Sequence, residues 1–282
     1  MSTAVCNVCF RHCAIPEGGT GFCGGRVCKD NRIMAGNYGM VTSLALDPIE
    51  KKPLARFCPG SLILSVGSYG CNLRCPFCQN HSISWSEEAM KLTDRAEYIS
   101  PEALDKIAAK YRGRGNIGVA FTYNEPLIGY EFVRDTAKLV HERGMKNVLV
   151  TNGTAELAVL EELLPYIDAM NIDLKAFTDR FYTELIGGNR SQVLDFIKKA
   201  ASGCHVELTT LIIPGENDSE DEMRQLTAWV ASLPDGASIP LHISRFFPQF
   251  HMTDRPATDV PHIYRLAETA REKLQFVYTG NC

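Results

Sequence analysis

Residues 61–78 read SLILSVGSYGCNLRCPFC, an apolar run followed at once by three closely spaced cysteines. Cys71, Cys75 and Cys78 have a Cys-x3-Cys-x2-Cys spacing. Three thiolates on one short loop can hold three corners of an iron–sulfur cube, in which each iron takes one cysteine ligand. A four-iron cube then keeps one iron without a protein ligand, and an open coordination position is typical of catalytic metal sites. The spacing therefore predicts a cluster that binds and activates a small molecule.

The bulk composition predicts one large domain, or one domain with a small appendage. The chain has 282 residues, of which 45% are hydrophobic and 22% are charged, as in ordinary globular domains. No apolar stretch reaches the length of a membrane span. The N-terminus lacks the basic and apolar segments of a secretory signal, so we expect a cytoplasmic protein. The net charge of −4 argues against a dedicated nucleic-acid surface.

The chain contains eleven cysteines, which is a high count. In a cytosolic protein of this length, the Cys-x2-Cys and Cys-x3-Cys spacings favour metal binding over disulfides. An odd number of cysteines also fits poorly with a complete disulfide framework. We interpret Cys58, Cys204 and Cys282 as packing residues, because free cysteine behaves as a small hydrophobic side chain.

The residue composition and pattern divide the chain into two parts. Residues 1–59 are rich in glycine and cysteine and predict a small irregular module, whereas residues 60–282 alternate strand and helix patterns. We expect strands at Leu62–Val66, Ile117–Thr122, Asn147–Thr151, Ala169–Asp173, His205–Ile213, Pro240–Ser244 and Gln275–Tyr278. We expect helices at Pro101–Arg112, Gly129–Arg143, Ala155–Leu164, Ser191–Ala201, Ser219–Ser232 and Val260–Lys273.

This alternation implies parallel strands joined by right-handed crossovers. About six such units predict an α/β fold of the partial (β/α)6 barrel type, with its chemistry at the C-terminal ends of the strands. Polar segments fall at these ends: Glu125 follows the second strand, Asn152 the third, and Asp173 and Lys175 close the fourth. Strand alternation points Asp173 and Lys175 to the same side.

Plainer interpretations of these segments stay open. Residues 124–126 also suit an ordinary helix start, residues 151–153 a β–α turn, and Asp173 with Lys175 an exposed ion pair. The three loop cysteines would alternatively form a zinc site or simply pack, although zinc usually has a fourth ligand.

With Phe77 directly before its last cysteine, the loop resembles the signature of the radical S-adenosylmethionine (SAM) superfamily. The similarity extends from about Ser61 to Gly280. The resemblance implies a [4Fe–4S] cluster on the three loop cysteines, whose fourth iron is chelated by the amino and carboxylate groups of SAM. It also implies that Phe77 lies near the adenine.

The segment Thr122–Pro126 resembles the Gly-Gly-Glu motif of this family, in which a carboxylate and backbone carbonyls receive the methionine ammonium. Glu125 would supply the charge, since a cation needs acceptors. Tyr123 and Asn124 stand where the family has glycines, and we expect them to contact SAM through their carbonyls.

Two further segments resemble the glycyl-radical activating enzymes. Residues 151–153 (Thr-Asn-Gly) are similar to their Asp-Thr-Asn-Gly segment, with Val150 in place of the aspartate. Residues 173–175 (Asp-Leu-Lys) are similar to a segment whose side chains line the cofactor and substrate pocket, so Lys175 would meet the methionine carboxylate. The residues expected from these segments to bind the cofactor are Thr151, Asn152, Asp173 and Lys175.

Within the superfamily, the chain most resembles the pyruvate formate-lyase activating enzymes. More narrowly, it is similar to the radical SAM member of the AmmeMemoRadiSam system, which is encoded alongside Memo-like and AMMECR1-like proteins. The supporting segments are Cys6-x2-Cys9-x3-Cys13, Gly21–Cys23, Asp47–Leu54 and Pro59–Ser61. Members of the narrower group commonly continue past this C-terminus with another cysteine pair, whereas this sequence stops at Cys282.

Cys6, Cys9, Cys13 and Cys23 predict a second metal site in the N-terminal module. A glycine-rich module of ~60 residues has little core and would gain stability from a bound metal. Zinc, an auxiliary iron–sulfur cluster and free thiols all remain open at this point.

The resemblance implies reductive cleavage of SAM to methionine and a 5′-deoxyadenosyl radical, with an electron from a donor of the flavodoxin or ferredoxin type. The open side of a partial barrel favours a protein substrate, such as the glycine of a glycyl-radical enzyme. One alternative is the same chemistry on a small molecule or peptide, together with Memo-like and AMMECR1-like partners. Others are a non-enzymatic iron–sulfur or zinc scaffold, and a barrel hydrolase or isomerase with Glu125 and His242 as acid–base groups.

Overall fold

The computed structural model describes residues 2–91 and 96–282 and is built around one mostly parallel sheet. The strand order is β14-β13-β12-β11-β10-β9-β7-β6, and only β6 runs antiparallel to its neighbour. The strands are β6 (Ser43–Pro48), β7 (Leu62–Gly67), β9 (Asn116–Phe121), β10 (Lys146–Thr151), β11 (Ala169–Asp173), β12 (His205–Ile212), β13 (Leu241–Arg245) and β14 (Val277–Gly280).

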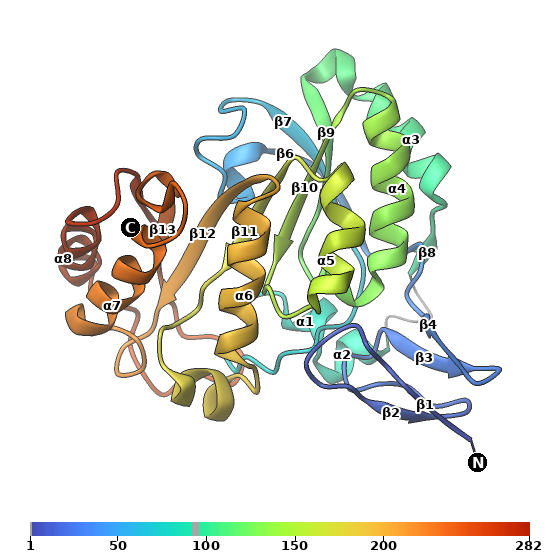
Figure 1. Cartoon of the computed structure of the whole chain (residues 1–282), viewed down its shortest axis with the longest axis horizontal. Coiled ribbons are helices and arrows are strands. Elements are labelled where there is room, and N and C mark those ends of the chain that lie inside the picture. The colour runs from blue at the N-terminus through green and yellow to red at the C-terminus, as the bar shows by residue number, and fades with distance from the viewer. Residues whose placement is uncertain (1, 92–95) are drawn as a thin grey trace.

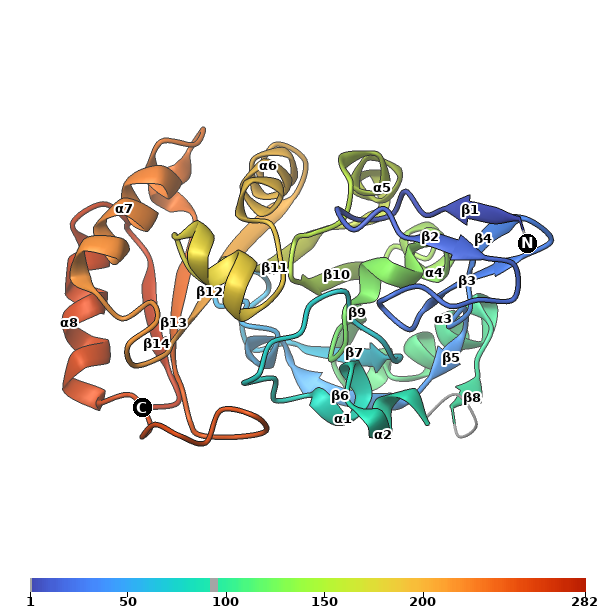
Figure 2. The same cartoon turned by 90° about the horizontal axis from the view of Figure 1, so that it is seen from below.

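Helices lie along the outer face of this curved sheet, as Figures 1 and 2 show. They are α3 (Pro101–Lys110), α4 (Tyr130–Glu142), α5 (Leu157–Leu163), α6 (Arg190–Ala201), α7 (Glu220–Ala231) and α8 (Val260–Arg271). Within the described residues, β14 and β6 form the two edges of the sheet, so the barrel is partial. The predicted α/β partial barrel is therefore confirmed. No helix in these ranges is long and apolar enough to span a bilayer.

Alternate residues of the strands pack into two separate apolar clusters. Val119 and Leu149 belong to the large cluster that the outer helices cover. Ala120 and Val148 face the other way and pack with the segment Ile49–Leu54 in a smaller cluster. Burial on both faces is typical of parallel strands, and it explains why these strands read as nearly continuous apolar runs.

Local sequence signals mark the start or the end of three helices. The Ser100 side chain accepts a hydrogen bond from Ala103 N–H at the start of α3, and Ser219 accepts one from Glu222 N–H at the start of α7. Such caps satisfy N–H groups that have no partner within the helix. Beyond the end of α4, Gly144 has a φ of +68°, a conformation that glycine adopts without strain.

The N-terminal segment forms small strand pairs beside the barrel (Figure 2). These pairs are β1 (Thr3–Val5) with β2 (Ala14–Pro16), β3 (Arg26–Lys29) with β4 (Arg32–Ala35), and β5 (Met40–Val41) with β8 (Glu97–Tyr98). Two short helices, α1 (His81–Ser84) and α2 (Glu87–Met90), follow the cysteine loop. A bridge between Cys9 and Ala155 attaches the segment to the loop before α5. Strand β6 lies within the range expected for the N-terminal module but pairs with the main sheet, and a module boundary at residue 59 stays a prediction.

Asn116, the first residue of β9, bridges an irregular pairing between β7 and β9. The register of the two strands shifts between Leu62 and Leu64. Oδ1 of Asn116 accepts a hydrogen bond from Leu64 N–H at 2.9 Å, and Nδ2 donates one to the Ala108 carbonyl at 2.9 Å. Because Asn116 is buried, its amide supplies partners that water cannot reach. It thereby fixes the strand that leads into the cysteine loop.

We expect Asn116→Ala to lower the free energy of unfolding by about 2–4 kcal/mol, because it leaves a buried N–H and a buried C=O without partners. Chemical denaturation of the metal-free chain measures this change. Gln225→Ala removes an exposed amide from α7 and is the control, with an expected change below about 0.5 kcal/mol. Equal effects of the two substitutions would contradict this role of Asn116.

Glu207 is a fully buried carboxylate on β12 that gathers four partners. It accepts hydrogen bonds from the N–H groups of Ala55 and Arg56 at 2.9 and 2.7 Å. Nε2 of His205 lies 3.0 Å from one carboxylate oxygen, and Nε2 of His242 lies 2.6 Å from the other. Burial opposes ionisation of Glu207, but these hydrogen bonds outweigh it and lower its pKa to about 2.

A carboxylate whose pKa is lowered by folding stabilises the fold above its ordinary pKa of 4.5, and this contribution is lost as the pH falls through the folded-state value. Between about pH 4.5 and about pH 2, we therefore expect the unfolding free energy of the wild-type chain to fall more steeply than that of Glu207→Gln. Urea denaturation across this range, on metal-free protein, measures both slopes. Identical slopes would show that Glu207 is not the titrating group.

Candidate active site at the C-terminal ends of the strands

The loop that follows β7 brings Cys71, Cys75 and Cys78 together. Cys75 is buried and the other two are half-buried. The Leu73 N–H donates to Sγ of Cys71 at 3.4 Å. The loop begins at Gly70, whose φ is +93° and where a Cβ atom would lie 2.7 Å from the Cys23 carbonyl oxygen. A glycine is therefore required for the chain to turn into this loop against the N-terminal module.

The buried position of the three thiols disfavours their charged forms. Burial raises the pKa of Cys71 well above its ordinary value of 9.0, and the charges of Cys75 and Cys78 add to this effect. Burial also raises the pKa of Cys75 to about 12, although the Lys175 ammonium opposes the shift. Metal ions bind the thiolate form and supply positive charge in place of the protons. The loop is therefore suited to thiolate ligands only when cations are bound.

Two side chains brace the main chain of this loop. Asn124 accepts from Ser68 N–H at 3.0 Å through Oδ1, and its Nδ2 donates to the Tyr69 and Gly70 carbonyls at 3.1 Å each. Arg74 donates to the Cys71 carbonyl at 2.8 Å. These four hydrogen bonds hold the main chain of the loop.

Glu125 occupies the end of β9 and is 3% exposed. Its carboxylate accepts hydrogen bonds from Leu127 N–H at 3.1 Å, from the Thr151 hydroxyl at 2.7 Å and from Asn152 N–H at 2.8 Å. Burial raises its pKa to about 7, although these hydrogen bonds favour the charged form. A carboxylate offers about four acceptor positions, so one remains for a ligand.

Asn152, at the end of β10, belongs to a closed ring of hydrogen bonds beside the cysteine loop. Its Nδ2 donates to Oδ1 of Asn72 at 2.9 Å, Nδ2 of Asn72 donates to the Thr154 hydroxyl at 2.7 Å, and that hydroxyl donates to Oδ1 of Asn152. Nδ2 of Asn152 also lies 3.8 Å from Sγ of Cys71. The ring joins the end of β10 to the loop that follows β7.

Asp173 and Lys175 point to the same side, as strand alternation predicts. Nζ of Lys175 lies 2.7 Å from Oδ2 of Asp173, and both side chains are half-buried. Burial alone would lower the pKa of Lys175, but the charges of Asp173 and Cys75 raise it well above its ordinary value. The charged form of Lys175 is therefore favoured, in an ion pair with Asp173.

Phe77 and Tyr123 take different positions. The Phe77 ring is buried and lies 6.1 Å from the ring of Phe181, centroid to centroid. The Tyr123 hydroxyl donates to Oδ2 of Asp47 at 2.7 Å. This bond turns the Tyr123 side chain towards strand β6, so only its main chain is left to take part in a binding site after the end of β9.

Sequence reasoning missed several residues that contact the site. Asn72 and Thr154 complete the ring with Asn152, and the Tyr182 hydroxyl accepts from Lys175 N–H at 3.1 Å. The position of Asn72 between two of the loop cysteines was the one available signal for it. The sixth-strand His242 pairs with Glu207 on β12 rather than with Glu125.

In the described ranges 2–91 and 96–282, no three His, Cys, Asp or Glu side chains converge so that they could hold one metal ion. A tetrahedral zinc site needs all of its ligands on one ion. Cysteines that bind a cluster each take a different iron, so they need no such convergence. The lack of convergence therefore does not count against a cluster at the loop cysteines.

Asn124→Ala is expected to raise the alkylation rate of the loop cysteines at least ~10-fold in metal-free protein, because three hydrogen bonds to the loop are lost and local opening becomes easier. Mass spectrometry after timed iodoacetamide treatment measures this rate. Tyr123→Phe is the control, since its hydroxyl contacts Asp47 instead, and a change below ~2-fold is expected. Protection that survives in Asn124→Ala would contradict the bracing role.

Comparison with known proteins agrees with this arrangement. The family described as the Radical SAM superfamily matches residues 65–227, which is more than half of the chain. An uncharacterized protein of Methanocaldococcus jannaschii is 40% identical over 280 residues, which cover 98% of this chain and 80% of the relative. Pyruvate formate-lyase 1-activating enzyme of Escherichia coli K12 is 28% identical over 178 residues, which cover 61% of this chain and 70% of the enzyme.

A solved structure of Streptococcus suis SuiB bound to S-adenosylmethionine shares the fold. Its TM-score is 0.58 at 17% identity, and the match covers 76% of this chain and 48% of SuiB. The predicted resemblance to pyruvate formate-lyase activating enzymes is confirmed, and the narrower group with Memo-like and AMMECR1-like partners stays a prediction. The chain therefore belongs to the radical SAM superfamily, whose members use a [4Fe–4S] cluster and S-adenosylmethionine.

Proposed function

We propose that this chain is an enzyme that cleaves SAM reductively, with Cys71, Cys75 and Cys78 each binding one iron of the cluster and SAM chelating the fourth iron. The observation that carries the proposal is the grouping of three thiols on one braced loop, at the edge where the parallel strands end. When bound, the cluster supplies one electron that divides SAM into methionine and a 5′-deoxyadenosyl radical, which takes a hydrogen atom from the substrate.

The charged side chains around the loop match the two charged groups of the methionine part of SAM. Glu125 has one free acceptor position and Asp173 carries a second carboxylate, so both can receive the ammonium group. Lys175 offers its ammonium to the carboxylate of SAM while Asp173 holds it in place at 2.7 Å. The half-buried setting strengthens each of these contacts relative to water.

The remaining residues of the site act mainly as positioning groups. The Thr151 hydroxyl and the Asn152 N–H hold the Glu125 carboxylate. Tyr123 and Asn124 contribute their carbonyls to the ammonium site, since their side chains have other partners. Phe77, buried directly before Cys78, is placed to contact the adenine.

We infer a protein substrate, with a glycyl-radical enzyme as the first candidate. The sheet does not close among the described residues, so the strand ends are reachable from one side by a large partner. The E. coli relative is, by its name, an activating enzyme for another protein. In this proposal, residues 60–282 form the catalytic barrel and residues 1–59 form its appended module. A donor of the flavodoxin or ferredoxin type supplies the electron.

Two other kinds of function have weaker support. A hydrolase or isomerase with Glu125 and His242 as its acid–base pair needs these groups to work together, but His242 lies 2.6 Å from Glu207 instead. A non-enzymatic scaffold would not need Glu125, Asp173 and Lys175 beside the thiols. The same radical chemistry on a small molecule or peptide, with Memo-like and AMMECR1-like partners, differs only in substrate.

Cys75→Ala is expected to abolish release of 5′-deoxyadenosine from SAM, because one iron loses its ligand and the cluster is not held. The assay uses anaerobically reconstituted protein with dithionite, and chromatography measures the product. A decrease in the broad brown absorption of the iron–sulfur protein should accompany the loss.

Cys204→Ala is the matched control, since this half-buried thiol contacts only the Ala200 carbonyl of α6 among the partners described. It should cleave SAM at the wild-type rate. Turnover that survives in Cys75→Ala would refute the ligand assignment, and loss of turnover in both variants would point to a general effect on folding.

A further inference from the structure

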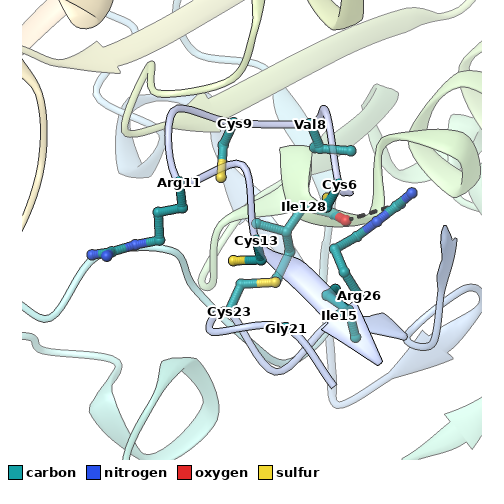
Figure 3. A pocket seen from close by; sticks show the side chains of 10 residues that line it. All are labelled: Cys6, Val8, Cys9, Arg11, Cys13, Ile15, Gly21, Cys23, Arg26 and Ile128. Carbon is teal, nitrogen blue, oxygen red and sulfur yellow. Dashed lines mark hydrogen bonds between the residues drawn. The ribbon is translucent and has the colours of Figure 1, made fainter. Parts of the chain in front are cut away.

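Four cysteines of the N-terminal module line one pocket. Cys6, Cys9, Cys13 and Cys23 surround it, and apolar side chains including Val8 close its walls. Figure 3 shows the four side chains grouped around this space, with Arg11 and Arg26 at its sides. The fifth cysteine of the module, Cys28, is buried elsewhere and lies 3.7 Å from the Glu17 carboxylate. The pocket is thus a selective grouping of thiols and not a general property of the cysteine-rich segment.

Main-chain hydrogen bonds hold these cysteines in place. The Cys6 N–H donates to the Cys13 carbonyl at 2.9 Å, and the His12 N–H donates to the Cys9 carbonyl at 3.1 Å. His12 has a φ of +40°, a conformation that costs free energy for a residue with a side chain. The conformation that brings the thiols together is therefore locally strained at His12.

The sulfur environments repeat those of the cluster loop. In the cluster loop, the amide two residues after Cys71 donates to its sulfur, and the Asn80 amide, two residues after Cys78, favours the thiolate form of Cys78. In the pocket, Arg11 and Gly25 stand two residues after Cys9 and Cys23, and their amides favour the thiolate forms in the same way. N–H donors at sulfur stabilise thiolate ligands and tune the potential of iron–sulfur clusters. Two separate cysteine groups thus share one ligand-like arrangement.

The pocket also lies directly beside the cluster loop. The Cys71 N–H donates to the Cys23 carbonyl at 3.0 Å, so one hydrogen bond connects a cysteine of each group. Arg11 extends from the pocket and donates through Nε to the Asn72 carbonyl at 2.7 Å. Its positive charge faces thiols of both groups. Two negatively charged metal–thiolate centres side by side need such a cation between them.

The pocket cysteines have one geometric feature in common with the loop cysteines. Zinc requires four ligands on one ion, and no three potential ligands converge in that way in the described part of the chain. The loop cysteines, in a motif of a family that uses a [4Fe–4S] cluster, show the same lack of convergence. Four thiols in a mainly apolar pocket, with Arg11 beside them and Arg26 paired to Glu131, are a complete ligand set for a four-iron cluster.

We propose that Cys6, Cys9, Cys13 and Cys23 bind a second iron–sulfur cluster, fully ligated by protein and adjacent to the SAM-binding cluster. This inference rests on the proposed function of the Cys71–Cys78 loop for its redox context. The second cluster has no open iron, so it does not bind SAM.

The test counts metal in the anaerobically reconstituted full-length chain. We expect about eight irons per wild-type chain, and about four in either the triple variant Cys71→Ala, Cys75→Ala, Cys78→Ala or the double variant Cys9→Ala, Cys23→Ala. Cys28→Ala removes a buried thiol of the same module outside the pocket and should keep the wild-type count. Circular dichroism verifies that each variant is folded.

Electron paramagnetic resonance separates the two sites. The reduced triple variant should give a cluster signal that SAM leaves unchanged, whereas SAM should shift the signal of the reduced double variant. In the wild-type chain, magnetic coupling between adjacent clusters should broaden the spectrum relative to the sum of the two variants.

A folded triple variant that holds zinc or no metal, beside a double variant that keeps about four irons, would overturn the proposal. In the wild-type chain, about four irons with a single signal that SAM shifts would overturn it as well, even where a variant does not fold. Failure of the proposed function looks different: the triple variant would then keep the wild-type iron content and the double variant would lose all of it.

Discussion

The rest of the site depends on one constraint, the burial of three thiols on a single loop at the end of β7. Burial raises the pKa of Cys71 and of Cys75, and bound metal favours the thiolate forms that act as ligands. Parallel strands place their C-terminal ends at one edge, and this geometry brings Glu125, Asn152 and Lys175 to the same loop. One thiol-rich loop and one sheet edge together define where the chemistry takes place.

The N-terminal module supports this loop from the opposite side to the barrel. The Phe22 ring lies between the guanidinium groups of Arg11 and Arg74, 3.5 and 3.8 Å from its centroid, as in favourable cation–π contacts. Arg74 also binds the Cys71 carbonyl, and Arg11 binds the Asn72 carbonyl. The module is therefore part of the wall of the active site, which explains why the cysteine-rich segment and the barrel occur in one chain.

The sequence predicted those parts of the structure that depend on local patterns. The seven parallel strands, from β7 to β14 without β8, lie within a few residues of the expected ranges. The helix caps at Ser100 and Ser219 were readable because side chain and partner are three residues apart. Strand β6 was not expected, because its pairing with β7 depends on a contact between segments and not on a local period.

The features of the site likewise divide into those that local patterns predict and those that depend on contacts between distant segments. The shared side of Asp173 and Lys175 follows from alternation over two residues. The Tyr123 hydroxyl binds Asp47, 76 residues away, and Asn72 binds Thr154, 82 residues away. Such pairings exist only once the chain has folded, so the Tyr123 side chain could not be assigned from a motif that resembles Gly-Gly-Glu. Glu125 was identified, but its three protein donors were not.

The claim that one iron remains open for SAM has a direct test. Electron–nuclear double resonance on the reduced protein, with SAM labelled by magnetic isotopes at its amino nitrogen and carboxylate oxygen, reports whether these atoms bind iron. The account predicts hyperfine coupling from both labels to the cluster signal. A cluster signal without coupling from either label, in protein saturated with SAM, would contradict it.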